Sequence, residues 1–294
     1  MLKELCEAAP NNVEFKNSFA SAHGRLCKIH QALGQKDMAL ELCKKYHDLT
    51  KALSTDFPNN LEYQTSYGFA LAKLHELYKD SGQLELALDN IKRANQVRKK
   101  LYQLAPKIVE YKSNLATAYQ QLGKIHKLLG NPDEALTHTQ AAIQLAEALH
   151  QSHPYTISYL DNLFILTMQL ADVYTSVNKY DAALPFLETA IQQEKELYQF
   201  YKKNKEYTHN LAIVYYKTSF TCTALSKDSK ALDYIEVAIQ LFQASDEMAP
   251  NDPSIKPLLY KSLQQKGDVH SSIGSLRSAL KAYGKANELL QQMY

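Results

Sequence analysis

Few residues of this chain have the types and the spacing that chemistry requires. His150 and His153 form the only tightly spaced histidine pair, and a metal ion would need further ligands besides these two. The motifs of a phosphate-binding loop, a serine-nucleophile elbow, a helical zinc site and a calcium loop are all missing from the sequence. The pattern therefore predicts no catalytic residue, no cofactor and no metal, and we expect the protein not to be an enzyme.

The charged residues indicate no dedicated partner of opposite charge. Lys and Arg number 33 against 31 Asp and Glu, which gives a net charge of +2. A nucleic-acid-binding surface would show a basic excess, so we expect no nucleic-acid partner. The densest basic stretch, Lys92–Arg93 with Arg98–Lys100, alternates with apolar positions and is interpreted as a solvated outer face. Asp133 and Glu134 lie at a predicted helix start, where negative charge is favourable without any catalytic role.

Composition indicates long regular elements in a chain of 294 residues. Apolar residues make up 45%, while glycine and proline number only nine each. No apolar run approaches the ~20 residues that a membrane-spanning helix needs, and the first residues lack an apolar signal core. The four cysteines form no CxxC pair, which is typical of buried thiols in a reducing compartment: Cys6, Cys27, Cys43 and Cys222. We therefore expect a cytoplasmic protein with no membrane partner.

The chain repeats itself with a period of 48 residues. Pro10, Pro58, Pro106 and Pro154 are each one period apart, and Pro250 lies two periods further on. An alanine followed by a leucine recurs in all six units, and the alanines are Ala39, Ala87, Ala135, Ala183, Ala231 and Ala279. Such self-similarity is the signature of a repeat architecture.

Each unit has the pattern of a helical hairpin. In residues 108–151, apolar residues recur at steps of three and four on both sides of Gly130. Gly130 supplies the left-handed residue that ends a helix, and alanine is needed where two helices cross closely. We expect a single domain, 1–294, built of the repeat units 12–55, 60–104, 108–151, 155–200, 203–247 and 252–293. Residues 1–9 align with the tail of a preceding second helix or form an N-terminal cap, and the chain is interpreted as a piece of a longer protein.

Within this register the third unit resembles the tetratricopeptide repeat (TPR). Tyr119, Leu122 and Gly123, followed by Ala135, match that motif, and the other units follow it more loosely. The usual unit of the family is about 34 residues, so this chain resembles its long-unit variant, found in bacterial multidomain signalling proteins. The resemblance implies an all-α, right-handed α-solenoid of about six helix-turn-helix repeats. It also implies a non-catalytic scaffold that binds a protein or peptide in its concave groove.

The same resemblance places the groove on the first helix of each unit. In the fourth and fifth units this stripe consists of Asp161, Ile165, Met168, Asp172, His209, Ile213, Tyr216 and Phe220. Its five large apolar residues would form a surface for an apolar anchor, with Asp172 and His209 nearby for orientation. The alternative is that curvature of the repeat array buries these residues between neighbouring units.

Two polar columns of the repeat have both structural and functional interpretations. His30, His126 and His270 share a column with Tyr78 and Tyr174, which favours packing between helices over metal binding. Asn114, Asn162 and Asn210 lie beside the predicted stripe, where they would bond either a partner's backbone or the next helix. The sequence therefore predicts a scaffold, possible in two forms: a sensor part of a larger bacterial signalling or defence protein, or a structural module that self-associates.

Overall fold

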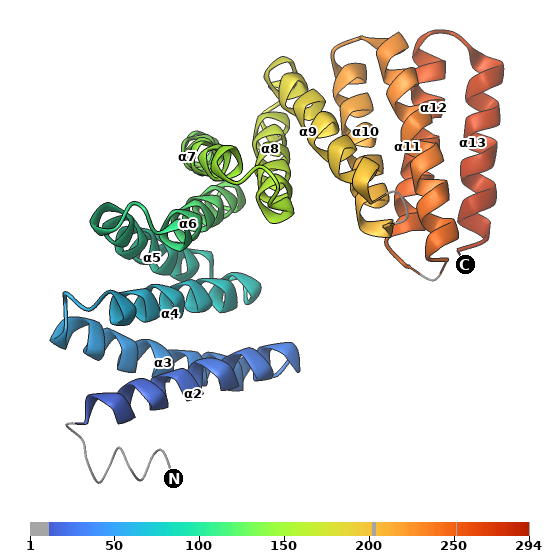
Figure 1. The fold of residues 1–294 in the computed structure, drawn as a ribbon. Coiled ribbons are helices and arrows are strands. Elements are labelled where there is room, and N and C mark those ends of the chain that lie inside the picture. Colours follow the sequence, from blue (N-terminus) through green and yellow to red (C-terminus); the bar gives the residue numbers. More distant parts are fainter. Residues whose placement is uncertain (1–11, 202–203, 251, 294) are drawn as a thin grey trace. The chain divides into compact units, whose positions relative to one another are not determined.

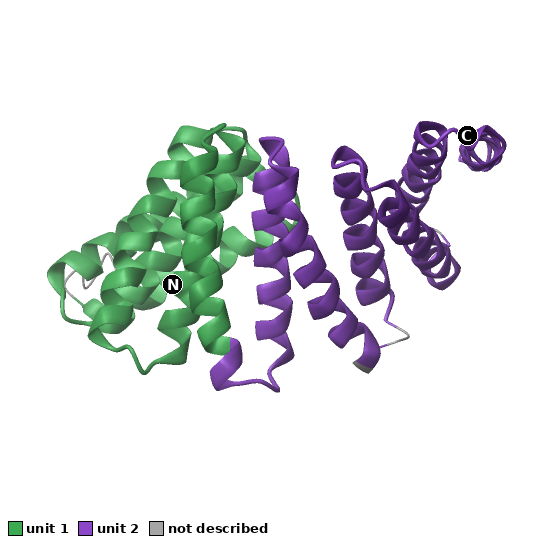
Figure 2. Cartoon of the chain, turned by 90° about the horizontal axis from the view of Figure 1, so that it is seen from above, with its two compact units in different colours: residues 1–149 green, residues 150–294 purple. Residues whose placement is uncertain are grey.

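The computed structural model describes residues 12–201, 204–250 and 252–293, whose regular structure is entirely α-helical (Figure 1). These residues form two compact units, 1–149 and 150–294, which Figure 2 distinguishes by colour. We describe each unit by itself, so the prediction of one continuous domain remains a prediction.

The first unit contains the three N-terminal hairpins. Consecutive helices pack against each other, α2 on α3, α3 on α4, α4 on α5 and α5 on α6. The ring of His138 on α7 stacks on His126 and Tyr119 of α6. The helices are α2 (Val13–Ala32), α3 (Lys36–Asp56), α4 (Leu61–Asp80), α5 (Leu84–Leu104), α6 (Val109–Leu128) and α7 (Pro132–Ser152, whose last three residues belong to the second unit).

The second unit repeats this arrangement with three further hairpins. They are α8 (Ile157–Ser176) with α9 (Tyr180–Phe200), α10 (Lys205–Ala224) with α11 (Asp228–Met248), and α12 (Ile255–Ser272) with α13 (Leu276–Gln291). Each helix packs on the next along the chain. Helix α12 begins two residues later than the 48-residue register gives, because Pro257 has no N–H to donate and is tolerated only in the first turn of a helix.

The turn inside each hairpin uses one left-handed residue. Gly34, Gly82, Gly130 and Gly274 have φ between 72° and 76°, as the sequence predicts for Gly130. In the fourth and fifth hairpins the position is held by Asn178 (φ 58°) and Ser226 (φ 54°). Because a side chain is unfavourable at such a φ, these two turns are strained relative to the other four.

The alanine columns lie where the paired helices cross. The first column is buried throughout, with exposed fractions of 0% in five units and 4% at Ala279. The second column, seven residues on, is also buried, at Ala94, Ala142, Ala190, Ala238 and Ala286. Both helices of a hairpin can therefore approach closely enough to enclose larger side chains, such as Ile91 in the first unit and Phe242 in the second.

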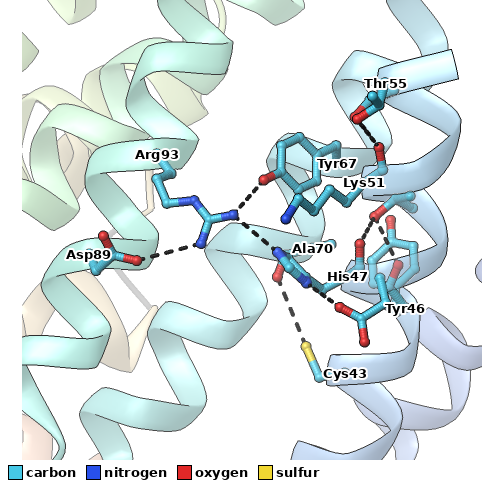
Figure 3. Close-up of polar contacts among 12 residues, drawn as sticks. Cys43, Tyr46, His47, Lys51, Thr55, Tyr67, Ala70, Asp89 and Arg93 are labelled. Carbon is cyan, nitrogen blue, oxygen red and sulfur yellow. Dashed lines mark hydrogen bonds and ion pairs between the residues drawn. The ribbon is translucent and has the colours of Figure 1, made fainter. Parts of the chain in front are cut away.

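A polar network ties three helices of the first unit together. Figure 3 shows Arg93 of α5 donating a hydrogen bond to the Tyr67 hydroxyl of α4 over 2.6 Å, with His47 of α3 3.4 Å from the guanidinium. Asp89 pairs with Arg93 at 3.5 Å. Burial opposes the charged guanidinium, but Tyr67 and Asp89 together raise the pKa of Arg93. Because these groups satisfy one another, the network has a structural role.

The cysteines are placed as predicted where they are described. Cys27, Cys43 and Cys222 are free thiols with no exposed surface, and Cys6 lies outside the described residues. Over the described part of the chain, no helix combines the length and the apolar character that crossing a membrane requires.

Candidate functional site

The structure places all eight predicted groove residues on two first helices of the second unit. Asp161, Ile165, Met168 and Asp172 lie on α8, and the other four lie on α10. Both helices pack against α9, so the shared neighbour holds them in one layer.

Burial divides the five apolar residues of this stripe into two groups. Ile165 and Phe220 are exposed, at 45% and 47% of their surface. Met168 is buried in the core of the second unit, and Ile213 and Tyr216 pack half-buried against the same core. Met168 is therefore buried as the second alternative expects, and of the five only Ile165 and Phe220 present large apolar surface.

The two acidic residues of the stripe have different surroundings. Asp172 accepts a hydrogen bond from Lys217 Nζ at 2.6 Å, so its charge is already neutralised within the protein. Asp161 accepts a hydrogen bond from the Tyr207 hydroxyl at 3.4 Å, while burial and then nearby Glu206 raise its pKa. Asp161 and Glu206 therefore give the N-terminal end of the stripe an acidic character, and neither has an ion-pair partner among the described residues.

His209 does not present a free imidazole in the way that an orienting group would. Its ring lies edge-on to Phe242, with 5.6 Å between the ring centroids. Burial lowers its pKa, with Asp252 opposing and Lys205 adding to the shift. Its Nδ1 atom is buried and has no hydrogen-bond partner among the described residues. The ring therefore belongs to the packing between α10 and α11.

One buried carboxyl beside the stripe was not predicted from the sequence. Glu194 of α9 has no exposed surface, and its two oxygens make no hydrogen bond of normal geometry with the described residues. Burial raises its pKa to about 8; the side chain of Asn210 lowers it, and nearby Asp161 and Glu206 raise it further. The available signal was its column, which holds the apolar residues Ala146, Phe242 and Leu290, although Arg98 lies two periods earlier.

The same column corrects the interpretation of the basic stretch as a solvated face. Arg98, two periods before Glu194, is buried at 6% exposure. It donates a hydrogen bond to the backbone oxygen of Asn114 at 3.0 Å and lies over the Phe69 ring. Burial lowers its pKa to about 10, with Glu76 opposing. Arg98 is therefore a core residue of the first unit, because its register position points toward the next helix.

The asparagine and histidine columns have structural contacts. The proximity of the Asn210 side chain to Glu194 on the neighbouring helix favours, at that position, bonding between helices over bonding to a partner. His126 is buried against His138, with ring centroids 5.3 Å apart. No group of three or more His, Cys, Asp or Glu side chains in the described part of the chain has an arrangement suited to a metal ion. His153 instead contacts Ser152 and the ring of Tyr159.

A second concave feature, also missed from the sequence, lies elsewhere in the second unit. A groove of about 600 Å³ runs between α11 and α13 over α12, and none of the eight predicted residues lines it. The second unit therefore offers two separate surfaces: the α8–α10 surface, centred on Ile165 and Phe220, and the α11–α13 groove.

Comparison with known proteins matches one segment of the chain to a family of repeats. Residues 115–155 match the family model described as tetratricopeptide repeat. No curated protein sequence matches the chain.

Solved structures with the same fold have little sequence in common with this chain. The structure of BtubC (BKLC) from P. vanneervenii has 15% identity and a TM-score of 0.63, covering 86% of this chain and 90% of that one. The apo form of RapI has 12% identity and a TM-score of 0.56, with 99% and 88% covered. The TPR-like repeats of a putative kinesin light chain from Podosopora anserina have 16% identity and a TM-score of 0.53, with 76% and 95% covered.

These likenesses concern the fold. The all-α architecture predicted from the sequence, six helix-turn-helix, TPR-like repeats whose helices pack sequentially, is confirmed.

Proposed function

We propose that this protein is a non-catalytic interaction module that binds a protein or peptide partner on the α8–α10 surface. The observation that carries the proposal is the exposure of Ile165 and Phe220 on first helices of adjacent hairpins. Large apolar side chains that stay in contact with water within one stripe are typical of partner-binding surfaces, where their burial contributes most of the binding energy.

The comparisons support this function in general terms. Repeats of the TPR type bury their own hydrophobic faces against one another and present extended surfaces for binding. The match at residues 115–155 and the fold shared with other repeat proteins are consistent with such a role. We also propose that this module is the sensor part of a larger bacterial signalling or defence protein.

The surroundings of the surface indicate the chemistry of the partner. Phe220 lies beside the ring of Tyr180, with 6.3 Å between centroids, so an apolar side chain would meet two aromatic rings there. Asp161 and Glu206 add negative charge at the N-terminal end of the stripe. We therefore expect a segment with apolar anchors and a basic residue at one end, because electrostatic complementarity steers such partners into register.

The test compares recovery of partners by the wild-type protein and by the variant Ile165→Glu/Phe220→Glu. Both side chains are exposed, so the substitutions leave the core intact, whereas a change at half-buried Tyr216 would also disturb folding. The matched control is Tyr155→Glu, which removes a 97% exposed aromatic outside the helices. A partner lost only from the double variant supports the proposal, and an unchanged set of partners contradicts it.

We propose self-association as the alternative function, because one further observation favours it. Leu280 is 75% exposed, although Leu88 and Leu184, at the same position of the repeat, are buried. Leu276, one turn earlier on α13, is 69% exposed. Sedimentation equilibrium of the wild type and of Leu280→Glu tests this alternative. A concentration-dependent mass that the substitution abolishes supports it, and a monomer in both samples contradicts it.

A further inference from the structure

The α11–α13 groove is built by the last three helices of the second unit. Figure 1 shows α11 and α13 running side by side with α12 behind them. Leu259 and Leu263 of α12 form the floor, and Ile239 of α11 and Leu289 of α13 line the walls. The lining from α13 and the residue that follows it runs from Ser278 to Gln292, a length of about 20 Å. The groove is therefore an elongated trough with an aliphatic floor.

The internal repeat explains why the trough is open at this place. The equivalent groove, between α9 and α11 over α10, measures about 450 Å³ and is lined by Tyr215 and Tyr234, whose ring centroids are 5.9 Å apart. One period later these positions are occupied by Leu263 and Ala282. Two aromatic rings are thus replaced by smaller side chains, which leaves the extra volume uncovered.

The position of Ala282 is aromatic in both other hairpins of the second unit. Phe186, two periods earlier, stacks on Tyr174 with 5.6 Å between centroids and a 9° angle between the rings. An aromatic residue at this position fills the outer side of its own hairpin, so alanine here removes packing that the fold otherwise uses. We infer that the open groove is available to side chains of a partner.

Of the three lysines that line the groove, one forms an ion pair with a described residue and two do not. Lys266 of α12 pairs with Glu236 of α11 at 2.7 Å. On α13, Lys281 and Lys285 line the opposite wall, and neither has an ion-pair partner within 4.0 Å among the described residues. They lie four residues apart and therefore on one face, a single turn from each other. Glu288 is the only acidic residue of that wall, which leaves it net positive.

We propose that the α11–α13 groove binds an acidic amphipathic helix of a protein partner. The apolar face of that helix packs over Leu263 and Ala282, in the space that Tyr215 and Tyr234 fill in the preceding hairpin. Two carboxylates of the partner's helix, one turn apart, pair with Lys281 and Lys285. This is the helix-in-groove mode of recognition, with specificity set by the charged wall. The site is distinct from the α8–α10 surface and does not depend on it.

The test uses two synthetic helical peptides of roughly 18 residues, long enough to run the groove. Both carry leucine along one face; one has glutamate and the other lysine at paired i, i+4 positions on the flank. Binding of each labelled peptide to the full chain is measured by fluorescence anisotropy. We expect the glutamate peptide to bind at least tenfold more tightly than the lysine peptide.

Two variants and a matched control assign the binding to this groove. Ala282→Tyr introduces the tyrosine that the preceding hairpin has at Tyr234. By filling the groove, it should weaken binding of the glutamate peptide at least tenfold. Lys281→Glu/Lys285→Glu should reverse the preference between the two peptides. The control, Lys179→Glu/Lys227→Glu, changes two exposed lysines of the same unit by the same net charge and should leave binding within twofold. Circular dichroism and urea unfolding verify that each variant is folded.

Three results would overturn the proposal. One is equal binding of both peptides, and another is undiminished binding to a folded Ala282→Tyr variant. The third is a concentration-dependent dimer of the wild type that Ala282→Tyr dissociates, because the occupant would then be a second copy of this chain. Loss of partners from Ile165→Glu/Phe220→Glu does not bear on this site, so the two proposals fail independently.

Discussion

At the scale of single residues, the second unit contains a buried carboxyl, Glu194, and a non-glycine residue with left-handed φ, Ser226. Glu194 occupies a column whose other members in the second unit are Phe242 and Leu290, and its carboxyl is buried without a cationic partner among the described residues. Burial without a nearby positive charge disfavours the ionised form of a carboxyl, so protonation of Glu194 is coupled to folding.

Glu194→Gln should stabilise the protein, increasingly as the pH rises. The pKa of Glu194 is about 8 in the folded protein, against 4.5 for an ordinary glutamate. The folded state therefore binds the proton more tightly, so the wild type is most stable below pH 4.5 and loses stability as the pH rises to about 8. Urea unfolding at pH 4, 6, 8 and 9 should show a difference between variant and wild type that grows up to about pH 8 and then levels off.

The control for this prediction is Glu196→Gln, which removes an exposed carboxylate from the same helix. It should change the free energy of unfolding only slightly, because the side chain is exposed. A Glu194→Gln difference that is independent of pH would show that the carboxyl is not protonated in the folded state.

Ser226→Gly should stabilise the fifth hairpin. Ser226 has φ 54°, in the left-handed region that glycine adopts in four of the other hairpins. Removing the side chain relieves strain of about 1 kcal/mol, partly offset by the greater freedom of glycine in the unfolded chain. We expect the free energy of unfolding, measured by thermal or urea unfolding, to rise by about 0.5 kcal/mol. Gly130→Ser, the reverse change, should destabilise; a gain from it would contradict the explanation.

At the scale of elements, the first helices differ in how they begin. Asn60 caps α4 by accepting hydrogen bonds from the backbone N–H groups of Glu62 and Tyr63, and Asn12 and Asn204 cap α2 and α10 in the same way. Ile108 has the same backbone conformation before α6 but offers no such acceptor. The first helices therefore gain different amounts of stability from an otherwise identical turn.

Ile108→Asn should stabilise the third hairpin by about 0.5–1 kcal/mol, because an asparagine side chain can satisfy free N–H groups at the start of α6. Ile108 is 41% exposed, so little buried contact is lost. Urea unfolding of this variant and of Asn60→Ala gives a matched pair, in which the second change removes a cap and should destabilise by about 1 kcal/mol. Equal effects of the two substitutions would refute the assignment of the cap.

At the scale of the whole molecule, the helices form two compact units, each of which has buried clusters of its own. Phe242 is fully buried in the core of the second unit, and Ile91 in a core of the first. In repeat proteins stability is distributed over neighbouring repeats, so a local lesion need not unfold the entire chain.

Phe242→Ala should destabilise the second unit by about 3–5 kcal/mol, because it leaves a cavity in that core. Hydrogen exchange followed by mass spectrometry should show lost protection in α10, α11 and α12. Protection in α3, α4 and α5 should persist, and the mirror-image variant Ile91→Ala should invert the pattern. A uniform loss of protection in both variants would show that the chain unfolds as one cooperative body.

The sequence by itself determined the period, the helices and their pairing. These depend on local chemistry: apolar residues at steps of three and four, a residue tolerant of left-handed φ between the helices, and alanines where helices cross. Each of these signals lies within one 48-residue unit, so comparison of the units with one another was enough to read them.

Only the tertiary structure decided which side chains remain accessible. Met168 and Ile165 lie on the same predicted stripe, yet one is buried in a core and the other is exposed. Arg98 and Glu194 are buried although their types favour water, and the groove beside Ala282 is open although its residues are ordinary. The physical reason is that exposure depends on what the neighbouring helix places against a residue, a property of pairs of elements that the pattern of one helix does not contain.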